Sequence, residues 1–204
     1  MKVSDILAHI RARLRDDNAE FTRTGDSFLI NQIRFWQNQL LAEFNQNIAE
    51  FTYTIPADLP KSEVEISFEP LKILAVFLNG VRLRVVSYEM AIRLLQSGEN
   101  NGIFYQKRGQ VFGFESEKVG DLQVFGVKKA VIDDADDELV LDDSFENLLV
   151  FCVYLDILKT NTTPSNLEQI NAFSVLVEQE KQLMRANFNR LNGETSFKTK
   201  CVRV

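Results

Sequence analysis

The chain has 204 residues, of which 45% are hydrophobic and 25% are charged, and its formal net charge is −6. This size and composition are typical of a globular protein with one core, or with one core and an insertion. The acidic balance argues against a protein that grips nucleic acid over a broad surface, because such binding needs many Lys and Arg contacts to phosphate.

The ends of the chain and its two cysteines indicate a compartment. The first residues lack the apolar stretch of a signal peptide, and the longest apolar run is shorter than the ~20 residues that span a bilayer. Cys152 lies in an apolar helix and Cys201 lies near the C-terminus, so the pair is interpreted as two free thiols. We therefore expect a protein of a reducing cytoplasm.

Two amphipathic helices are predicted before residue 51. Ser4 and Asp5 precede a first, short helix that ends in an arginine-rich turn, where the helix dipole favours cations. Asp26 can cap a second and longer helix, whose other face is rich in Asn and Gln. The apolar stripe of this second helix follows steps of three and four, through Leu29, Ile33, Trp36, Leu40 and Phe44.

From Phe51 the apolar period changes from 3.6 to 2, which predicts a β-rich region over residues 51–132. The pair Asn79-Gly80 predicts a β-hairpin between residues 73–78 and 81–86, because both residues tolerate a positive φ. Ser87 is expected to cap a short helix over Tyr88–Gln96 that closes at Gly98.

The densest apolar run, Leu148–Leu158, is interrupted only by Asp156 and predicts a helix enclosed on several sides. Asp143 with Glu146 forms an Asp version of the capping box at its start. Asp156 is placed at the helix margin, with a salt bridge to Arg34 as the alternative. Ser165 with Glu168 is expected to open a long last helix.

These elements predict an α+β fold in three parts. Residues 1–50 and 133–192 would form a helical bundle of two N-terminal and two C-terminal helices. Residues 51–132 would be a β-rich insertion, and residues 193–204 an extended C-terminal tail. The bundle would join halves that are distant in sequence, because the enclosed helix needs the N-terminal pair to cover it.

Catalytic, cofactor and metal signatures are absent from the sequence, so we expect no enzyme and no cofactor. His9 is the single histidine, which excludes multi-histidine zinc sites on count, and its place beside Ile10 in the first helix favours a structural role. No Gly-rich phosphate loop is present. The acidic block Asp133, Asp134, Asp136 and Asp137 is better explained as a solvated linker that leads into the apolar helix than as a Ca²⁺ site.

The C-terminal tail mixes apolar and basic residues, with no acid in its last seven positions. This composition suits an extended segment that docks on an acidic partner, and a disordered terminus is an equal alternative. The candidate docking residues are Phe197, Lys198, Lys200, Val202, Arg203 and Val204.

The order of these features resembles a known family, the head-to-tail connector or adaptor proteins of tailed bacteriophages and prophages. The resemblance rests on three segments and on the acidic stretch that precedes the apolar and final helices. The segments are Leu29-Ile30-Asn31-Gln32-Ile33, Tyr53-Thr54-Ile55-Pro56-Ala57-Asp58-Leu59, which is similar to the family's Y-x-L-P-x-D-L, and Asn79-Gly80 leading to Ser87-Tyr88-Glu89.

This resemblance implies a virion protein, assembled in the bacterial cytoplasm, that forms a homo-oligomeric ring between the portal protein and a tail or nozzle protein. DNA would pass without specific binding, the acidic block would line a lumen or a subunit interface, and the tail would dock on the portal. The short helix at 88–96 makes the insertion larger than in the smallest connectors. A nucleic-acid-binding or regulatory protein-interaction module is the alternative, and a small-molecule enzyme comes third.

Overall fold

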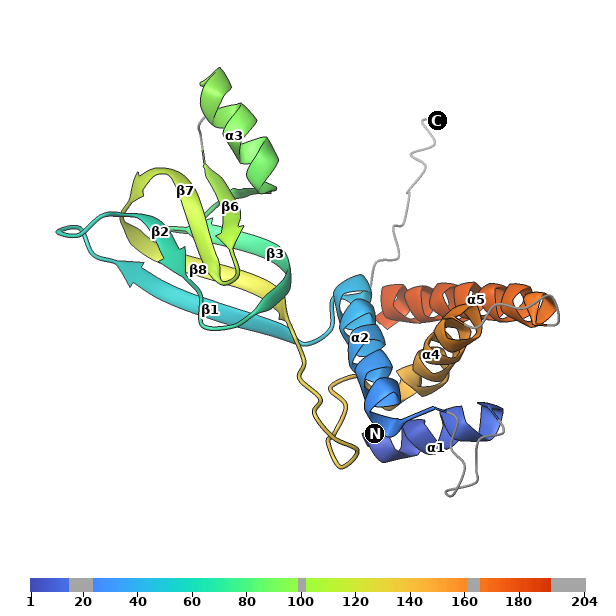
Figure 1. The fold of residues 1–204 in the computed structure, drawn as a ribbon. Helices are drawn as coiled ribbons and strands as arrows, with labels where there is room; N and C mark the ends of the chain where they lie inside the picture. The colour runs from blue at the N-terminus through green and yellow to red at the C-terminus, as the bar shows by residue number, and fades with distance from the viewer. Residues whose placement is uncertain (15–23, 99–101, 161–165, 192–204) are drawn as a thin grey trace, which may run out of the picture. The chain divides into compact units, whose positions relative to one another are not determined.

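The computed structural model describes residues 1–14, 24–98, 102–160 and 166–191. Over these ranges the chain is a mixed α+β protein with five α-helices and two four-stranded sheets (Figure 1). It divides into two compact units, Met1–Trp36 with Ile132–Val204, and Gln37–Val131. The first division falls inside the second helix, whereas the sequence pattern changes only near Phe51.

The first unit, called here the helical unit, contains α1 (Val3–Leu14), the start of α2 (Asp26–Phe44), α4 (Glu146–Thr160) and α5 (Leu167–Leu191). Figure 1 shows α4 between α1 and α5, and it packs against both. Its apolar side chains are buried around most of its circumference, as the sequence predicts for an enclosed helix. The buried residues of α4 are Leu148, Leu149, Val150, Cys152, Val153, Tyr154, Leu155 and Ile157.

The start of α4 differs from the predicted capping box. Asp142 caps the short 3-10 turn that precedes α4, and its Oδ1 accepts a hydrogen bond of 2.9 Å from the N–H of Ser144. Asp143–Phe145 form one turn of 3-10 helix, and α4 begins at Glu146. The cap at Asp142 therefore serves the 3-10 turn and not the first turn of α4.

The second unit, called here the β unit, holds the end of α2, all eight strands and α3. Its strands are β1 (Ile48–Ile55), β2 (Lys61–Glu65), β3 (Pro70–Leu78), β4 (Val81–Arg82), β5 (Arg84–Val86), β6 (Ile103–Arg108), β7 (Val111–Lys118) and β8 (Gly120–Lys128). One sheet has the order β1-β8-β3-β4, and the other has the order β2-β7-β6-β5. Both sheets contribute to one apolar core, which includes Val76, Phe104, Phe112 and Val124.

The predicted hairpin at Asn79-Gly80 is present but short. Both residues have a positive φ, 50° and 76°, as this turn requires. The expected strand 81–86 is split at Leu83, whose side chain is buried and whose N–H donates to the carbonyl of Val76 over 2.8 Å. The chain leaves the first sheet as β4 and enters the second sheet as β5, because burial of Leu83 bends it into the core.

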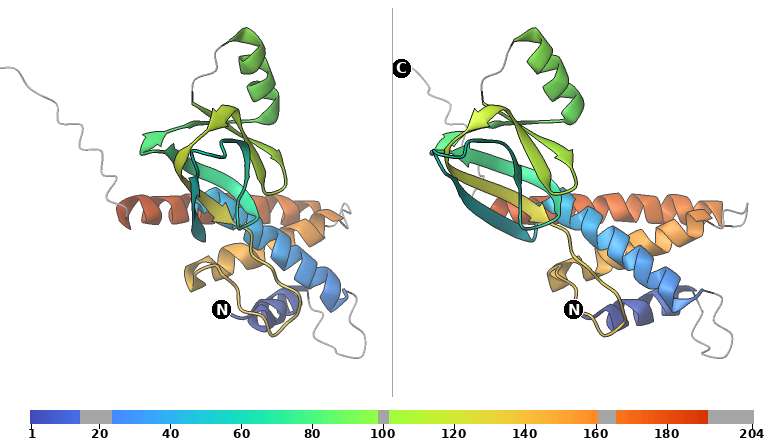
Figure 2. Two further views of the ribbon diagram at one scale, coloured as in Figure 1. Left: turned by 90° about the vertical axis from the view of Figure 1, so that its left-hand side faces the viewer. Right: turned by 60° about the vertical axis from the view of Figure 1, so that its left-hand side comes forward.

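The predicted short helix is α3 (Tyr88–Ser97), and both of its caps are confirmed. The Oγ of Ser87 accepts the N–H of Met90 over 3.3 Å, and Gly98 ends the helix at a φ of 77°. This helix connects β5 to β6, which run parallel. The further views in Figure 2 show α3 outside the two sheets, where Ala91 and Leu94 pack with Ile103.

Candidate functional site

The acidic block forms an ordered loop, called here the acidic loop (residues 133–142), which ends where the 3-10 turn begins. The carboxylate of Asp137 organises it, because one oxygen accepts the N–H of Asp133 over 2.7 Å and the N–H of Asp134 over 3.1 Å. The carboxylate of Asp134 in turn accepts the N–H of Asp136 over 2.9 Å. Two of the four predicted acids therefore hold the loop in shape.

The acidic loop also completes the N-terminus of α1. The carbonyl of Asp137 accepts the N–H of Val3 over 3.1 Å, and the carbonyl of Ala135 accepts the N–H of Ser4 over 2.9 Å. The N–H of Leu139 donates to the carbonyl of Met1 over 2.9 Å. The bonds donated by Val3 and Ser4 satisfy N–H groups that the first turn of a helix leaves without an internal partner. The expected solvated linker is therefore a structural part of the helical unit.

An arginine of α2 meets the beginning of this loop. Arg34 donates from Nη1 to the carbonyl of Ile132 over 3.2 Å, and the same nitrogen lies 3.5 Å from Oδ1 of Asp133. Asp156, for which a salt bridge to Arg34 was the alternative, is half-buried on α4, as a position at the helix margin predicts. Arg34 thus joins α2 to the acidic loop.

The hydrogen bonds change the acidity of two carboxyl groups in this region. The N–H groups of Asp133 and Asp134 hold the pKa of Asp137 below its ordinary value. The N–H and hydroxyl of Ser144 do the same for the pKa of Asp142. The lowered pKa values favour the charged form of both groups, and the exposed carboxylate of Asp133 adds to the acidic surface.

The single histidine and the cysteine of α4 both have contacts that indicate a structural role. Nδ1 of His9 on α1 lies 2.8 Å from Oε1 of Glu146 on α4, and Cys152 is buried inside α4. Over the described ranges, no group of three or more His, Cys, Asp or Glu side chains could hold a metal ion. Within the same ranges, no helix has the length and apolar character needed to cross a bilayer.

The predicted docking tail lies outside the described residues, and so do Cys201 and the capping residue Ser165. The tail residues concerned are Phe197, Lys198, Lys200, Val202, Arg203 and Val204.

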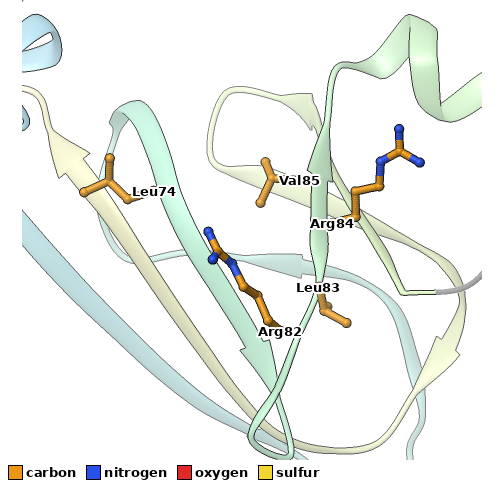
Figure 3. A pocket seen from close by; sticks show the side chains of 5 residues that line it. All are labelled: Leu74, Arg82, Leu83, Arg84 and Val85. Atoms are coloured by element: carbon orange, nitrogen blue, oxygen red, sulfur yellow. The ribbon is translucent and has the colours of Figure 1, made fainter. Parts of the chain in front are cut away.

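The β unit contains a groove that the sequence did not reveal. It has a volume of about 490 Å³ and is lined by Leu74, Arg82, Leu83, Arg84 and Val85 (Figure 3). Leu74 lies where the pairing of β3 with β8 shifts register between Ile73 and Ala75, and such irregularities re-aim side chains at sheet edges. These residues come together because the predicted strand 81–86 is split at Leu83 into β4 and β5. No sequence motif predicts that split.

The two arginines of the groove have no partner in the described part of the chain. Neither Arg82 nor Arg84 forms an ion pair or a side-chain hydrogen bond there, and both are exposed. In Figure 3, Arg82 and Val85 are directed to the side on which Leu74 lies, whereas Arg84 is directed to the other side of β5. The groove therefore combines an apolar wall with two available guanidinium groups.

A second feature missed from the sequence is the carboxylate of Glu115, whose side chain is only 4% exposed. Its oxygens accept the N–H of Gly102 over 3.1 Å and the N–H of Ile103 over 3.0 Å, and Lys118 pairs with it. Burial raises the pKa of Glu115, but the bonds from Lys118 and the backbone outweigh this and lower it. Glu115 thus anchors the start of β6 beside the groove strand β5.

No protein-family model matches the sequence, and no curated protein matches it.

Proposed function

We propose that this protein is a structural head-to-tail adaptor of a tailed bacteriophage, forming a homo-oligomeric ring between the portal protein and the tail. In this proposal the helices form a bundle, the β unit is an insertion, and the ring provides a conduit for DNA and a platform for the tail. The observation that supports the adaptor proposal most is the exposed apolar surface on two helices of the helical unit. The resemblance of the sequence to the connector family indicates what kind of assembly this surface serves.

The first of these surfaces lies on α5. Leu176 is 39% exposed and Leu183 is 59% exposed, and their spacing of seven residues places them on one face of the helix. This face differs from the one that carries Ile170 and Met184, which are buried. Beside Leu183 lies a shallow hollow of about 380 Å³ that is also lined by Gln179 and Gln182. The face supplies apolar contact area together with side-chain amides.

The second surface lies on the part of α2 that belongs to the helical unit. Phe28 is 39% exposed and Phe35 is 49% exposed, again at a spacing of seven residues. Large apolar side chains grouped on a surface mark interaction sites in many proteins. A closed ring requires two different faces on each subunit, one for each neighbour. We infer that the α5 face of one subunit contacts the α2 face of the next.

The acidic loop fits a conduit or an interface in this ring. Negative surface charge repels phosphate at range, so it lets DNA pass without being held. In our proposal the exposed carboxylates of Asp133 and Asp136 line the lumen or border the neighbouring subunit. The loop that carries them keeps its shape through hydrogen bonds within the same subunit, which the carboxylates of Asp137 and Asp134 accept.

The test is the native mass of the purified protein, alone and mixed with the portal protein of the same genome. We expect a ring-sized complex with the portal, and we expect a chain truncated after Leu191 to lose it, because the basic tail is the proposed portal contact. A persistent monomer that ignores the portal would overturn the proposal. Retention on DNA at low salt would instead favour the nucleic-acid-binding alternative.

A further inference from the structure

We propose that the groove of the β unit binds an extended, acidic segment of a partner protein, which adds to β5 as a new edge strand. This inference is independent of the proposed ring, because it rests on strand edges and charges inside the β unit alone. The three observations that carry it are an open edge on β5, an open edge on β3 across the groove, and two arginines without partners.

The outer edge of β5 offers backbone hydrogen-bonding groups. Within the described residues, β5 pairs only with β6 and is the last strand of its sheet. Arg84 donates its N–H to the carbonyl of Gly102 over 2.7 Å, which lies on the β6 side. Because successive residues of a strand alternate in direction, the N–H and carbonyl of Val85 are directed to the open side. An added strand would pair at Val85.

The edge of β3 bounds the other side of the groove and is also open. Its partner β4 pairs only with Phe77 and Leu78, and the carbonyl of Val76 accepts the N–H of Leu83. Within the described chain, no strand pairs with the β4 side of β3 between Leu71 and Ala75. The open edge of β5 is only three residues long, and β5 contacts β3. An open edge can accept a further strand by backbone pairing, so the two that flank this groove provide a place for one.

The side chains define the chemistry of that strand. Residues facing the groove would meet Leu74 and Val85, which favours apolar side chains at alternate positions. Residues on the opposite face would lie beside Arg84, and one end of the strand would approach Arg82 (Figure 3). A carboxylate suits both arginines, because guanidinium and carboxylate form paired, charge-assisted hydrogen bonds. The expected ligand therefore alternates apolar and acidic residues.

Two other occupants fit less well. The C-terminal tail of this chain carries Lys198, Lys200 and Arg203, so its charge has the same sign as the groove arginines. The acidic loop of a second copy has the correct charge, but its backbone is engaged with α1 and with itself. A separate partner with an acidic extended segment remains the ligand that both charge and backbone geometry favour.

The probe is a blocked peptide in which Val and Glu alternate, added to full-length protein labelled for amide NMR. We expect chemical-shift changes centred on Arg84–Val86, together with slower hydrogen exchange at the N–H of Val85. A peptide in which Lys replaces Glu should produce at least fivefold smaller shifts at equal concentration. A Val-Glu peptide with N-methyl groups on the pairing edge should bind least, because it cannot donate to β5.

Arg82→Gln and Arg84→Gln should each weaken binding of the Val-Glu peptide about two- to fivefold, the range for exposed ion pairs. Arg93→Gln is the matched control, because Arg93 is exposed on α3 and does not line the groove. Equal shifts with the Glu and Lys peptides, or shifts away from β5, would overturn the proposal. So would stronger shifts with a thymidine oligonucleotide, or shifts at β5 that grow with protein concentration alone.

Discussion

At the scale of single residues, the buried side chain of Glu115 forms several polar interactions at once. Its carboxylate accepts two backbone N–H groups at the start of β6 and pairs with Lys118. Glu115→Gln keeps the size of the side chain but replaces one accepting oxygen with a donor, which leaves one of the two part-buried N–H groups without a partner. We expect a loss of about 1–3 kcal/mol in the free energy of unfolding, measured by urea denaturation.

The matched control for this change is Glu117→Gln, because Glu117 is exposed two residues further along β7. We expect that variant to remain within about 0.5 kcal/mol of the parent. Faster hydrogen exchange at Gly102 and Ile103 should accompany the loss in the Glu115 variant alone. Equal stability of the two variants would show that the carboxylate of Glu115 contributes nothing beyond its size.

At the scale of elements, the acidic loop makes the stability of the helical unit depend on pH. The pKa of Asp137 is lower in the folded chain than in the unfolded chain. Its contribution is therefore present above the unfolded value of about 4 and is lost as the pH falls through the folded value. We expect the stability difference between the parent and Asp137→Asn to shrink from pH 6 to pH 3, measured by urea denaturation at each pH.

The control for the pH effect lies one residue away. Asp136→Asn removes the same charge, but the carboxylate of Asp136 accepts no hydrogen bond from the described residues. Its stability difference from the parent should stay nearly constant over the same pH range. A parallel decline for both variants would assign the pH dependence to net charge rather than to the hydrogen bonds of Asp137.

The elements also show what a sequence can reveal. The turn at Asn79-Gly80 and the caps of α3 at Ser87 and Gly98 were predictable, because each depends on residues that are close in the chain. The enclosed helix α4 was predictable because its composition leaves no polar face. Local chemistry and periodicity therefore account for most of the helices and for the hairpin.

The functional features were less accessible because they depend on contacts between distant residues. Glu115 meets Gly102 and Ile103 only through the pairing of β6 with β7, and the groove forms only because burial of Leu83 turns the chain between sheets. The acidic loop was recognised by composition, but its hydrogen bonds to Val3 and Ser4 join positions more than 100 residues apart. No spacing rule connects such positions.

At the scale of the whole molecule, the proposed ring predicts a specific sensitivity on α5. Leu176→Glu combined with Leu183→Glu places two charges on the exposed apolar face without disturbing the buried one. We expect subunit association to weaken at least about 100-fold, since burying two leucine side chains contributes roughly 3 kcal/mol or more. Sedimentation velocity of the protein mixed with the portal measures this loss.

The control is Asn171→Glu, which adds a charge at an exposed polar position on another face of α5. It should assemble like the parent, and circular dichroism should show unchanged helix content in all variants. Rings formed equally well by the double variant would exclude the α5 face as the subunit contact, while leaving the portal contact of the tail to be tested separately.

The division of the helical unit between the two ends of the chain sets an order of events during synthesis. The apolar side chains of α1 find their partners on α4, which begins at Glu146. At a translation rate of about 5–20 residues per second, roughly 7–26 s separate the emergence of these helices from the ribosome. The β unit is continuous in sequence and is complete by Val131. It can therefore fold first, while α1 and the start of α2 wait with their apolar faces uncovered, the stage at which the nascent chain most needs protection from aggregation.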